Sequence, residues 1–242
     1  TEAQNEQILL LASGLRQLVA DLRRGERMSS NKVVVASQHS TTTALIPSVI
    51  KRVRQHSEHI HIRLLSANLD ECTGLLLSRQ ADVAIVFQLA DDTNEFRADY
   101  LEAILIGNDR LIPVFSEALE IPPTGVKDLV DLPLITYPAD VFFGKVMERK
   151  IMPFLPPAAY HTPKVETALT LAALEMAASG IGIAWVPESL AASQLQSGRL
   201  VDLSAILPAC DLQIRAMRLE GWPSPAQELF WSQLISQEAA SS

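Results

Sequence analysis

The stretch KVVVASQHSTTTALIPSVIKRVRQHSEHIHIRLLSANLDECTGLLLSRQADVAIVF, residues 32–87, decides the fold. It holds short runs rich in β-branched residues, which predict strands, and two segments with helical periodicity between them. The strands are predicted at 32–36, 60–65 and 83–87, and the helices at 42–55 and 70–78. Strands joined through helices are typical of a parallel sheet covered on both faces. We therefore predict an α/β unit here, with Asp70 capping its second helix.

A second set of alternating elements follows this stretch. Residues 100–106 and 110–115 predict two further strands, and the Ile121-Pro122-Pro123-Thr124-Gly125 segment then breaks the pattern. Beyond it we predict strands at 134–136, 164–165, 183–186, 200–203 and 212–218, and helices at 142–154, 167–178, 188–196 and 225–237. Two α/β units in series predict two lobes with a cleft between them.

An amphipathic helix is predicted ahead of the first strand. Its apolar side chains recur at intervals of three and four residues, which is the seam of a helix lying along another helix. They are Ile8, Leu11, Leu15, Leu18 and Leu22. The seam covers little more than two heptads, so pairing with a second helix and packing on its own domain both stay open.

Composition excludes several classes of protein. The chain has 242 residues, of which 48% are hydrophobic, so we expect a well-filled core. Because it begins with Thr1 and not Met, we expect a fragment or a processed product. No run reaches the roughly 18 apolar residues of a membrane span. With 20 basic and 28 acidic side chains the net charge is -8, which argues against a large DNA-binding face. Cys72 and Cys210 lack zinc spacing, and we interpret them as free thiols, with a redox pair as the alternative.

The common catalytic and metal-binding motifs are missing. There is no G-x-S-x-G motif or phosphate-binding loop, and Gly180-Ile181-Gly182 lacks the third glycine of a dinucleotide site and follows a helix. His56, His59 and His61 have suggestive spacing, but no carboxylate or cysteine is placed to complete a metal site, so we interpret them as solvated. We predict no cofactor, no metal and no catalytic residue.

One polar loop stands at a position suited to ligand binding. The segment 40–43, Ser-Thr-Thr-Thr, follows the first strand, and a parallel sheet sends such loops to the edge where ligands bind. Hydroxyl and free backbone N–H groups there could bind an anion. The same residues are also ordinary helix caps, and both interpretations remain open.

At this point the ordered set of motifs resembles the regulatory part of the LysR-type transcriptional regulators. A linker helix precedes a strand, and the likeness then extends over nearly the whole chain. The similar segments are Ala44–Ile50, Ala81–Ile85, Gly180–Pro187, Gly198–Val201 and Ser224–Trp231. The chain departs from the family at loop positions, where Asn31, Ala36 and Arg79 replace a common Gly and Glu58 replaces a common Pro.

The resemblance implies a fold. It is an α/β fold of two Rossmann-like lobes joined by two crossover strands, like a type II periplasmic binding protein, preceded by a linker helix. We expect the linker and dimerisation helix at 1–27, lobe I at 28–112 and 217–242, and lobe II at 113–216.

The resemblance also implies partners. It predicts a cytoplasmic homodimer or homotetramer that binds a small anionic or polar effector between the lobes. Promoter DNA would be bound only through an N-terminal winged helix-turn-helix that this chain lacks. A solute-binding protein of a transport system is the alternative with the same fold, but it has no need of the amphipathic helix. An enzyme is a more distant third.

The family places its effector contacts at a few positions in each lobe. In lobe I they match Gln38, Ser40 and Thr41 after the first strand, and Ser66 and Asn68 after the second. In lobe II they match Thr136, Tyr137 and Thr167.

Within the family the chain is most similar to the hypochlorite-responsive regulators. The similar segments are Gln38–Ser40, Ile183–Glu188 and Leu229–Trp231. Those regulators sense oxidant through a methionine on the helix before the Gly-x-Gly turn. Here the matching position is Leu169, and Met176 lies two turns further on, so we expect a bound small molecule as the signal.

Overall fold

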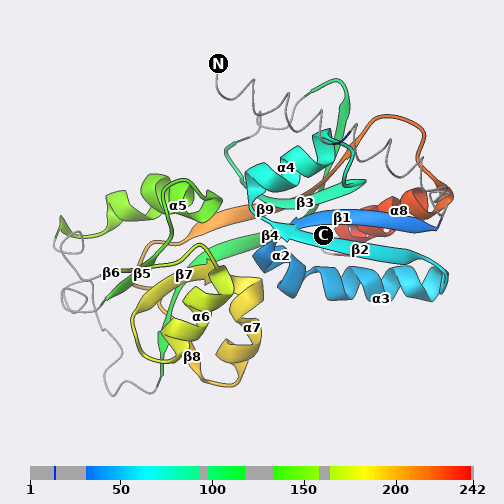
Figure 1. Cartoon of the computed structure of the whole chain (residues 1–242). Coiled ribbons are helices and arrows are strands. Elements are labelled where there is room, and N and C mark those ends of the chain that lie inside the picture. The colour runs from blue at the N-terminus through cyan, green and yellow to red at the C-terminus, as the bar shows by residue number, and fades with distance from the viewer. Residues whose placement is uncertain (1–13, 15–30, 93–97, 118–132, 158–163, 241–242) are drawn as a thin grey trace. The chain divides into compact units, whose positions relative to one another are not determined.

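The computed structural model describes residues 14, 31–92, 98–117, 133–157 and 164–240. The chain divides into two compact units, Thr1–Gly107 with Gln213–Ser242, and Asn108–Leu212. It passes between them twice, in the long strands β4 (Leu101–Ser116) and β9 (Cys210–Leu219) (Figure 1). The predicted seam from Ile8 to Leu22 lies outside the described residues, apart from Gly14, which is helical.

The first unit is built on a sheet in the order β2-β1-β3-β9. Strand β1 is parallel to both β2 and β3. Helix α4 contacts β1 and β3, whereas α8 contacts both β1 and α3, so helices cover both faces of the sheet (Figure 1). The elements are β1 (Lys32–Gln38), α2 (His39–Ala44), α3 (Ile46–His56), β2 (His61–Ala67), α4 (Leu69–Leu77), β3 (Val83–Leu89) and α8 (Pro225–Ala240).

Two predictions about the helices of this unit are wrong. The single helix expected at 42–55 is two helices, α2 and α3, which are separated by Leu45. Pro47 lies in the first turn of α3, where its missing N–H would have no partner in any case. The expected cap Asp70 is also wrong, because Asn68 is the N-cap of α4 and forms a capping box with Glu71, whose Oε2 accepts the Asn68 N–H at 3.0 Å.

The second unit has a mixed sheet. Strand β7 pairs antiparallel with β4 and parallel with β5, and β5 is parallel to β6. Strand β8 pairs with the end of β4. The elements are β5 (Leu134–Thr136), α5 (Phe142–Val146), a π-helical turn (Met147–Ile151), a 3-10 turn (Met152–Phe154), β6 (Lys164–Glu166), α6 (Thr170–Ala178), β7 (Ile183–Pro187), α7 (Glu188–Gln196) and β8 (Leu200–Asp202).

Strand β4 corrects a further prediction. The sequence suggested separate strands at 100–106 and 110–115, but one continuous strand runs from Leu101 to Ser116. Asp109 is buried within it, and its carboxylate accepts the backbone N–H of Ser189 at 3.2 Å. A polar residue between the two predicted strands therefore binds the start of α7.

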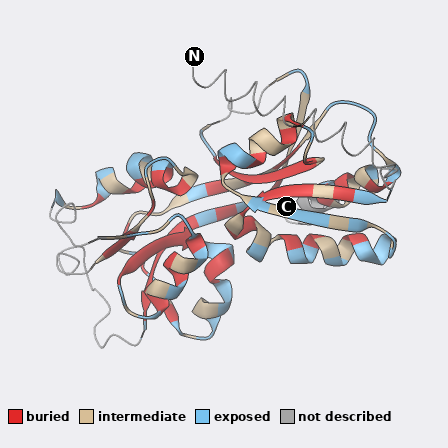
Figure 2. Ribbon diagram, in the orientation of Figure 1, coloured by how far each residue is buried: buried red, intermediate tan, exposed pale blue. Residues whose placement is uncertain are grey.

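The cores lie between the sheets and their helices (Figure 2). In the first unit β3 is buried along its whole length, and Phe230 and Trp231 of α8 are buried as well. In the second unit β7 is buried throughout and Trp185 has no exposed surface. Buried runs on both faces of a sheet are what a strand covered by helices requires.

Candidate functional site

The carboxyl ends of β1 and β2 carry a group of polar side chains. The strands are parallel and in register, with Ser37 opposite Ser66 and Gln38 opposite Ala67, so both end at one edge of the sheet. Helix α2 begins directly at this edge with His39. Ligands commonly bind at the carboxyl edge of parallel strands.

At this edge hydroxyl groups and an imidazole form a connected chain. The Nδ1 atom of His39 lies 2.8 Å from Ser66 Oγ, and Thr42 Oγ1 lies 3.2 Å from the same hydroxyl. Thr42 Oγ1 also contacts Ser37 Oγ and lies 3.0 Å from the carbonyl oxygen of Gln38. Ser66 is exposed, whereas His39 and Thr42 are half-buried, so this series of hydrogen-bonded side chains leads from the interior of the unit to its surface.

The predicted contact residues of the first unit differ in whether their side-chain polar atoms already form hydrogen bonds within the protein. Gln38 Oε1 accepts the Phe87 N–H at 2.6 Å, and the buried Thr41 hydroxyl donates to the Gln38 carbonyl at 2.8 Å. Asn68 is occupied as the cap of α4. Ser40 Oγ, by contrast, is buried and finds no hydrogen-bond partner among the described residues. Ser40 and Ser66 are therefore the hydroxyls best placed to meet a ligand.

The second unit brings together two of the three residues predicted there. The Thr167 N–H donates to the Thr136 carbonyl at 3.0 Å, so these two residues lie side by side at the end of β5. Thr167 Oγ1 accepts the Leu169 N–H at 3.1 Å. Tyr137 is buried, which raises the pKa of its phenol, and its hydroxyl donates to the Trp185 carbonyl at 2.8 Å. Its side chain therefore serves the core.

Sequence reasoning left His39 and Thr42 out of the site. The available signal was the position of Ser66 near the end of the second strand, which matches that of Ser37 near the end of the first, directly before His39. Parallel strands in register put such positions side by side, but the register could not be read from the sequence.

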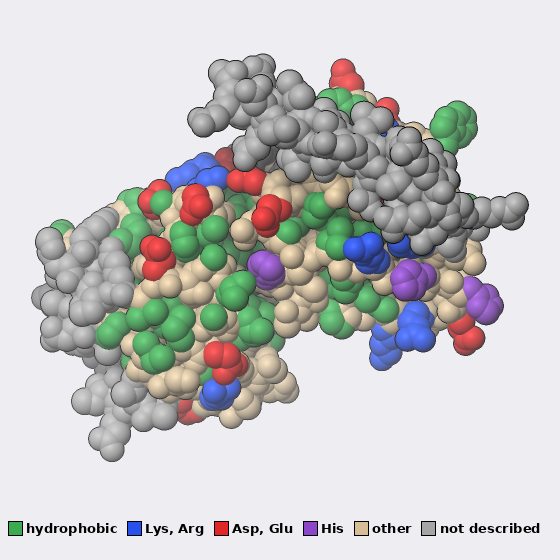
Figure 3. Space-filling view, viewed as in Figure 1, with side chains coloured by type: hydrophobic (Ala, Val, Ile, Leu, Met, Phe, Trp, Pro, Cys, Tyr) green, Lys and Arg blue, Asp and Glu red, His purple; other side chains and the backbone are tan. Residues whose placement is uncertain are grey.

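Histidines away from this edge show no site. His56, His59 and His61 are exposed, and Figure 3 shows histidine and basic side chains gathered over β2 and α3. His56 Nδ1 lies 3.0 Å from the Arg52 carbonyl. Among the described residues no group of three His, Cys, Asp or Glu side chains could hold a metal ion. No described helix is long and apolar enough to cross a bilayer.

Comparison with protein families shows to which family the chain belongs. Residues 26–239 match the model of the LysR substrate binding domain. Among curated proteins, the HTH domain-truncated transcriptional regulator QseD of Escherichia coli O157:H7 is 27% identical over 238 residues, 95% of this chain and 91% of that protein. The HTH-type transcriptional regulator YjiE of Escherichia coli K12 is 26% identical over 236 residues, 95% of this chain and 73% of that protein.

Solved structures share the fold. The regulatory domain of HypT from Salmonella typhimurium, bromide ion-bound, has a TM-score of 0.75 and 23% identity, covering 89% of this chain and 98% of that one. DarR of Vibrio fischeri, solved in complex with DNA, has a TM-score of 0.72 and 20% identity, covering 94% of this chain and 75% of that one.

The chain belongs to the LysR substrate-binding domain family. It is the regulatory, effector-binding domain of a LysR-type transcriptional regulator, which confirms the resemblance and the expected periplasmic-binding-protein-like fold. The matching curated proteins are transcriptional regulators rather than enzymes. Hypochlorite-responsive HypT is among the structural neighbours, as the subgroup resemblance suggested.

Proposed function

We propose that this domain binds a small polar or anionic effector at the carboxyl edge of β1 and β2. Two observations carry the proposal. Hydrogen bonds join His39 and Thr42 to exposed Ser66, and the buried hydroxyl of Ser40 at the start of α2 has no partner among the described residues. An unsatisfied buried hydroxyl costs free energy unless a ligand or water completes its hydrogen bonds. We also propose Thr136 and Thr167, which lie side by side at the end of β5, as effector contacts of the second unit.

Neutral donors would bind the effector. None of the eight predicted contact residues is Arg or Lys, so negative charge would be met by hydroxyls, His39 and the first backbone N–H groups of α2. A neutral hydrogen bond contributes only about 0.5–1.5 kcal/mol. Several together would give roughly micromolar affinity, about 8 kcal/mol. The bromide bound to the HypT regulatory domain supports an anionic ligand for this fold.

Effector binding would act on DNA through other parts of the regulator. We propose a cytoplasmic homodimer or homotetramer whose promoter contacts are made by an N-terminal winged helix-turn-helix. The acidic balance of the chain, -8, supports the proposal that it does not bind operator DNA alone. Light scattering that found only monomer at micromolar concentration would count against the proposed assembly. A sequence-specific gel shift with this chain alone would count against the proposal that the chain does not bind operator DNA by itself.

The effector site is tested by a thermal-shift screen of small anions and polar metabolites at constant ionic strength, because a ligand of the folded state raises its stability. The double variant Ser40→Ala, Ser66→Ala should bind the best hit at least tenfold more weakly by calorimetry. Ser57→Ala, a serine of the same unit away from this edge, is the matched control. Equal binding to the double variant would refute the site.

A further inference from the structure

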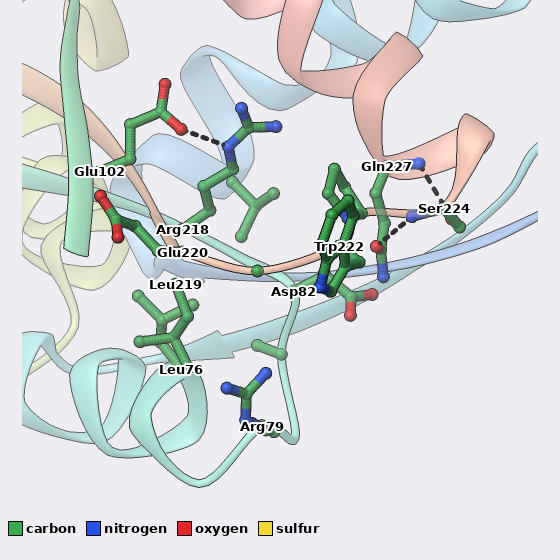
Figure 4. A pocket seen from close by; sticks show the side chains of 14 residues that line it. Leu76, Arg79, Asp82, Glu102, Arg218, Leu219, Glu220, Trp222, Ser224 and Gln227 are labelled. Carbon is green, nitrogen blue, oxygen red and sulfur yellow. Dashed lines mark hydrogen bonds and ion pairs between the residues drawn. The ribbon is translucent and has the colours of Figure 1, made fainter. Parts of the chain in front are cut away.

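A hollow lies at the edge of the first unit's sheet opposite the proposed effector site. It has a volume of about 640 Å³ and is formed where β3 begins, where β9 ends and in the loop that leads to α8 (Figure 4). Because β1 and β3 are parallel, the start of β3 is at the far edge from the carboxyl end of β1. This hollow is therefore separate from the proposed effector site.

Three side chains that line the hollow have no partner in the described part of the chain. Neither the guanidinium of Arg79 nor the carboxylate of Glu220 forms an ion pair there, and the side chain of Trp222 is fully exposed, at 102%. Arg218, which also lines the hollow, differs. It lies 2.7 Å from Glu102 and 2.8 Å from a second carboxylate.

Arg79 occupies an unfavourable backbone conformation. Its φ is 57°, and it is the one described residue other than glycine with a positive φ. It follows Ser78, the C-cap of α4, at a position where glycine is the usual residue because it has no Cβ. A strained arginine whose unpaired side chain lines a hollow is a reason to look for a ligand.

The charges around the hollow have both signs. Glu220 forms no ion pair with a described residue. Asp82 accepts the Val34 N–H and a hydrogen bond from Gln227, and the charge of Lys32 acts on it as well. Of the two arginines that line the hollow, Arg218 is paired, and Arg79 forms no ion pair with a described residue. An indole face attracts organic cations, especially beside carboxylates, and a guanidinium binds a carboxylate through two parallel hydrogen bonds.

We propose that this hollow binds a small zwitterion with an ammonium and a carboxylate group. The ammonium lies against Trp222 beside Asp82, and the carboxylate pairs with Arg79. Glu220 adds negative charge on the side of the hollow nearer Arg218 (Figure 4). The apolar side chains of Leu76, Val83 and Leu219 receive the rest of the ligand. The domain would then respond to two different ligands at the two edges of one sheet.

Tryptophan fluorescence tests the proposal directly. Trp185 and Trp231 are buried, so Trp222 is the exposed one of the chain's three tryptophans. Glycine betaine, a minimal zwitterion, should protect Trp222 from quenching by acrylamide. At equal ionic strength, choline, which has only the cation, and propionate, which has only the anion, should protect at least tenfold less well. Trp222→Phe should abolish the signal.

Two variants separate the charges. Arg79→Gly should lower the calorimetric affinity for betaine at least tenfold, to that for choline, while the melting temperature stays the same or rises. Asp82→Asn should weaken both ligands at least tenfold. Arg54→Ala and Glu58→Gln, exposed residues elsewhere in the unit, should change neither affinity, and Ser66→Ala should leave the Trp222 response intact.

Three results would overturn the proposal. The first is no protection by betaine up to about 100 mM, a hundredfold above a millimolar dissociation constant. The second is equal protection by choline and betaine in the unaltered protein. The third is betaine binding that survives in both Arg79→Gly and Asp82→Asn.

Discussion

Asp82 and Val34 are joined by hydrogen bonds in both directions. The Val34 N–H donates to Asp82 Oδ2 at 2.7 Å, and the Asp82 N–H donates to the Val34 carbonyl at 2.8 Å. The side chain thus supplies the acceptor that a neighbouring strand would otherwise give to β1, just before β3 begins. This explains the aspartate in the Ala81–Ile85 motif as a structural residue.

Asp82→Ala should lower the free energy of unfolding by about 1–3 kcal/mol, because it leaves the Val34 N–H without an acceptor. Asp82→Asn keeps an oxygen at that position and should cost less than the alanine variant. Urea denaturation of the two variants side by side measures the difference. Equal losses would show that the hydrogen bond to Val34 carries little of the effect.

The pH dependence of stability should report Asp82 as well. Burial raises the pKa of Asp82 above its ordinary 3.8, and the bond from Val34 opposes this only partly. A raised pKa in the folded state means that this group's contribution is fully present below pH 3.8 and is lost as the pH rises through the folded pKa. The unaltered protein should therefore lose stability relative to Asp82→Asn between about pH 4 and neutrality. Parallel stability curves would contradict this.

Arg79→Gly should raise the free energy of unfolding by about 0.5–1 kcal/mol, since glycine adopts a φ of 57° without a Cβ clash. That corresponds to a few degrees in the melting temperature, measured by calorimetry. Arg79→Ala is the control, because it removes the same side chain but keeps the Cβ. If alanine stabilised the protein as much as glycine, the gain would come from the lost charge.

Gly182→Ala should be among the more damaging single changes in the second unit. A Cβ at this position would lie 2.3 Å from the Pro133 carbonyl oxygen, a backbone atom that cannot turn aside. Overpacking of this kind costs about 1–3 kcal/mol or more. Gly107→Ala is the matched control, because its nearest neighbour, Ile214 Cδ1, is 3.9 Å away. Chemical denaturation should give Gly107→Ala a free energy of unfolding close to that of the unaltered protein.

Asp109→Ala should loosen the start of α7. The buried carboxylate accepts the N–H groups of Ser189 at 3.2 Å and Arg110 at 2.8 Å, as well as the Ser189 hydroxyl. Loss of these acceptors should cost about 1–3 kcal/mol. Asp202→Ala, which removes an exposed acceptor of the Ser204 N–H, should cost clearly less in the same assay. Hydrogen exchange should rise in the first turn of α7 and stay unchanged in α6.

The parts of the fold that could be predicted are those that a local pattern determines. Buried strands such as β3 and β7 have continuous apolar runs, and the helices between them have a clear period. The prediction failed where a distant residue decides. Two strands were predicted, ending at residue 106 and beginning again at 110, yet β4 continues through Asn108 and Asp109, and Asp109 binds Ser189 from a segment far along the chain.

The candidate site was predictable only as a set of positions. Strand ends gave the edge of the sheet and the family resemblance gave Ser40 and Ser66. What each side chain does there depends on its neighbours. Gln38 and Thr41 had the right chemistry, but their polar atoms bind the backbone of Phe87 and Gln38 itself. His39 belongs to the group because strand register brings it to Ser66.

The two crossings of the chain between its units set an order of folding during synthesis. Residues 108–212 are contiguous, so every residue of the second unit has left the ribosome before β9 is complete. The first unit must wait for residues 213–242, because β9 is the neighbour of β3 in its sheet and α8 packs on β1. A chain that stopped near residue 212 would carry a finished second unit beside a sheet with an open edge at β3. Such an edge is prone to aggregation, which makes premature termination more harmful at this point than the small number of missing residues suggests.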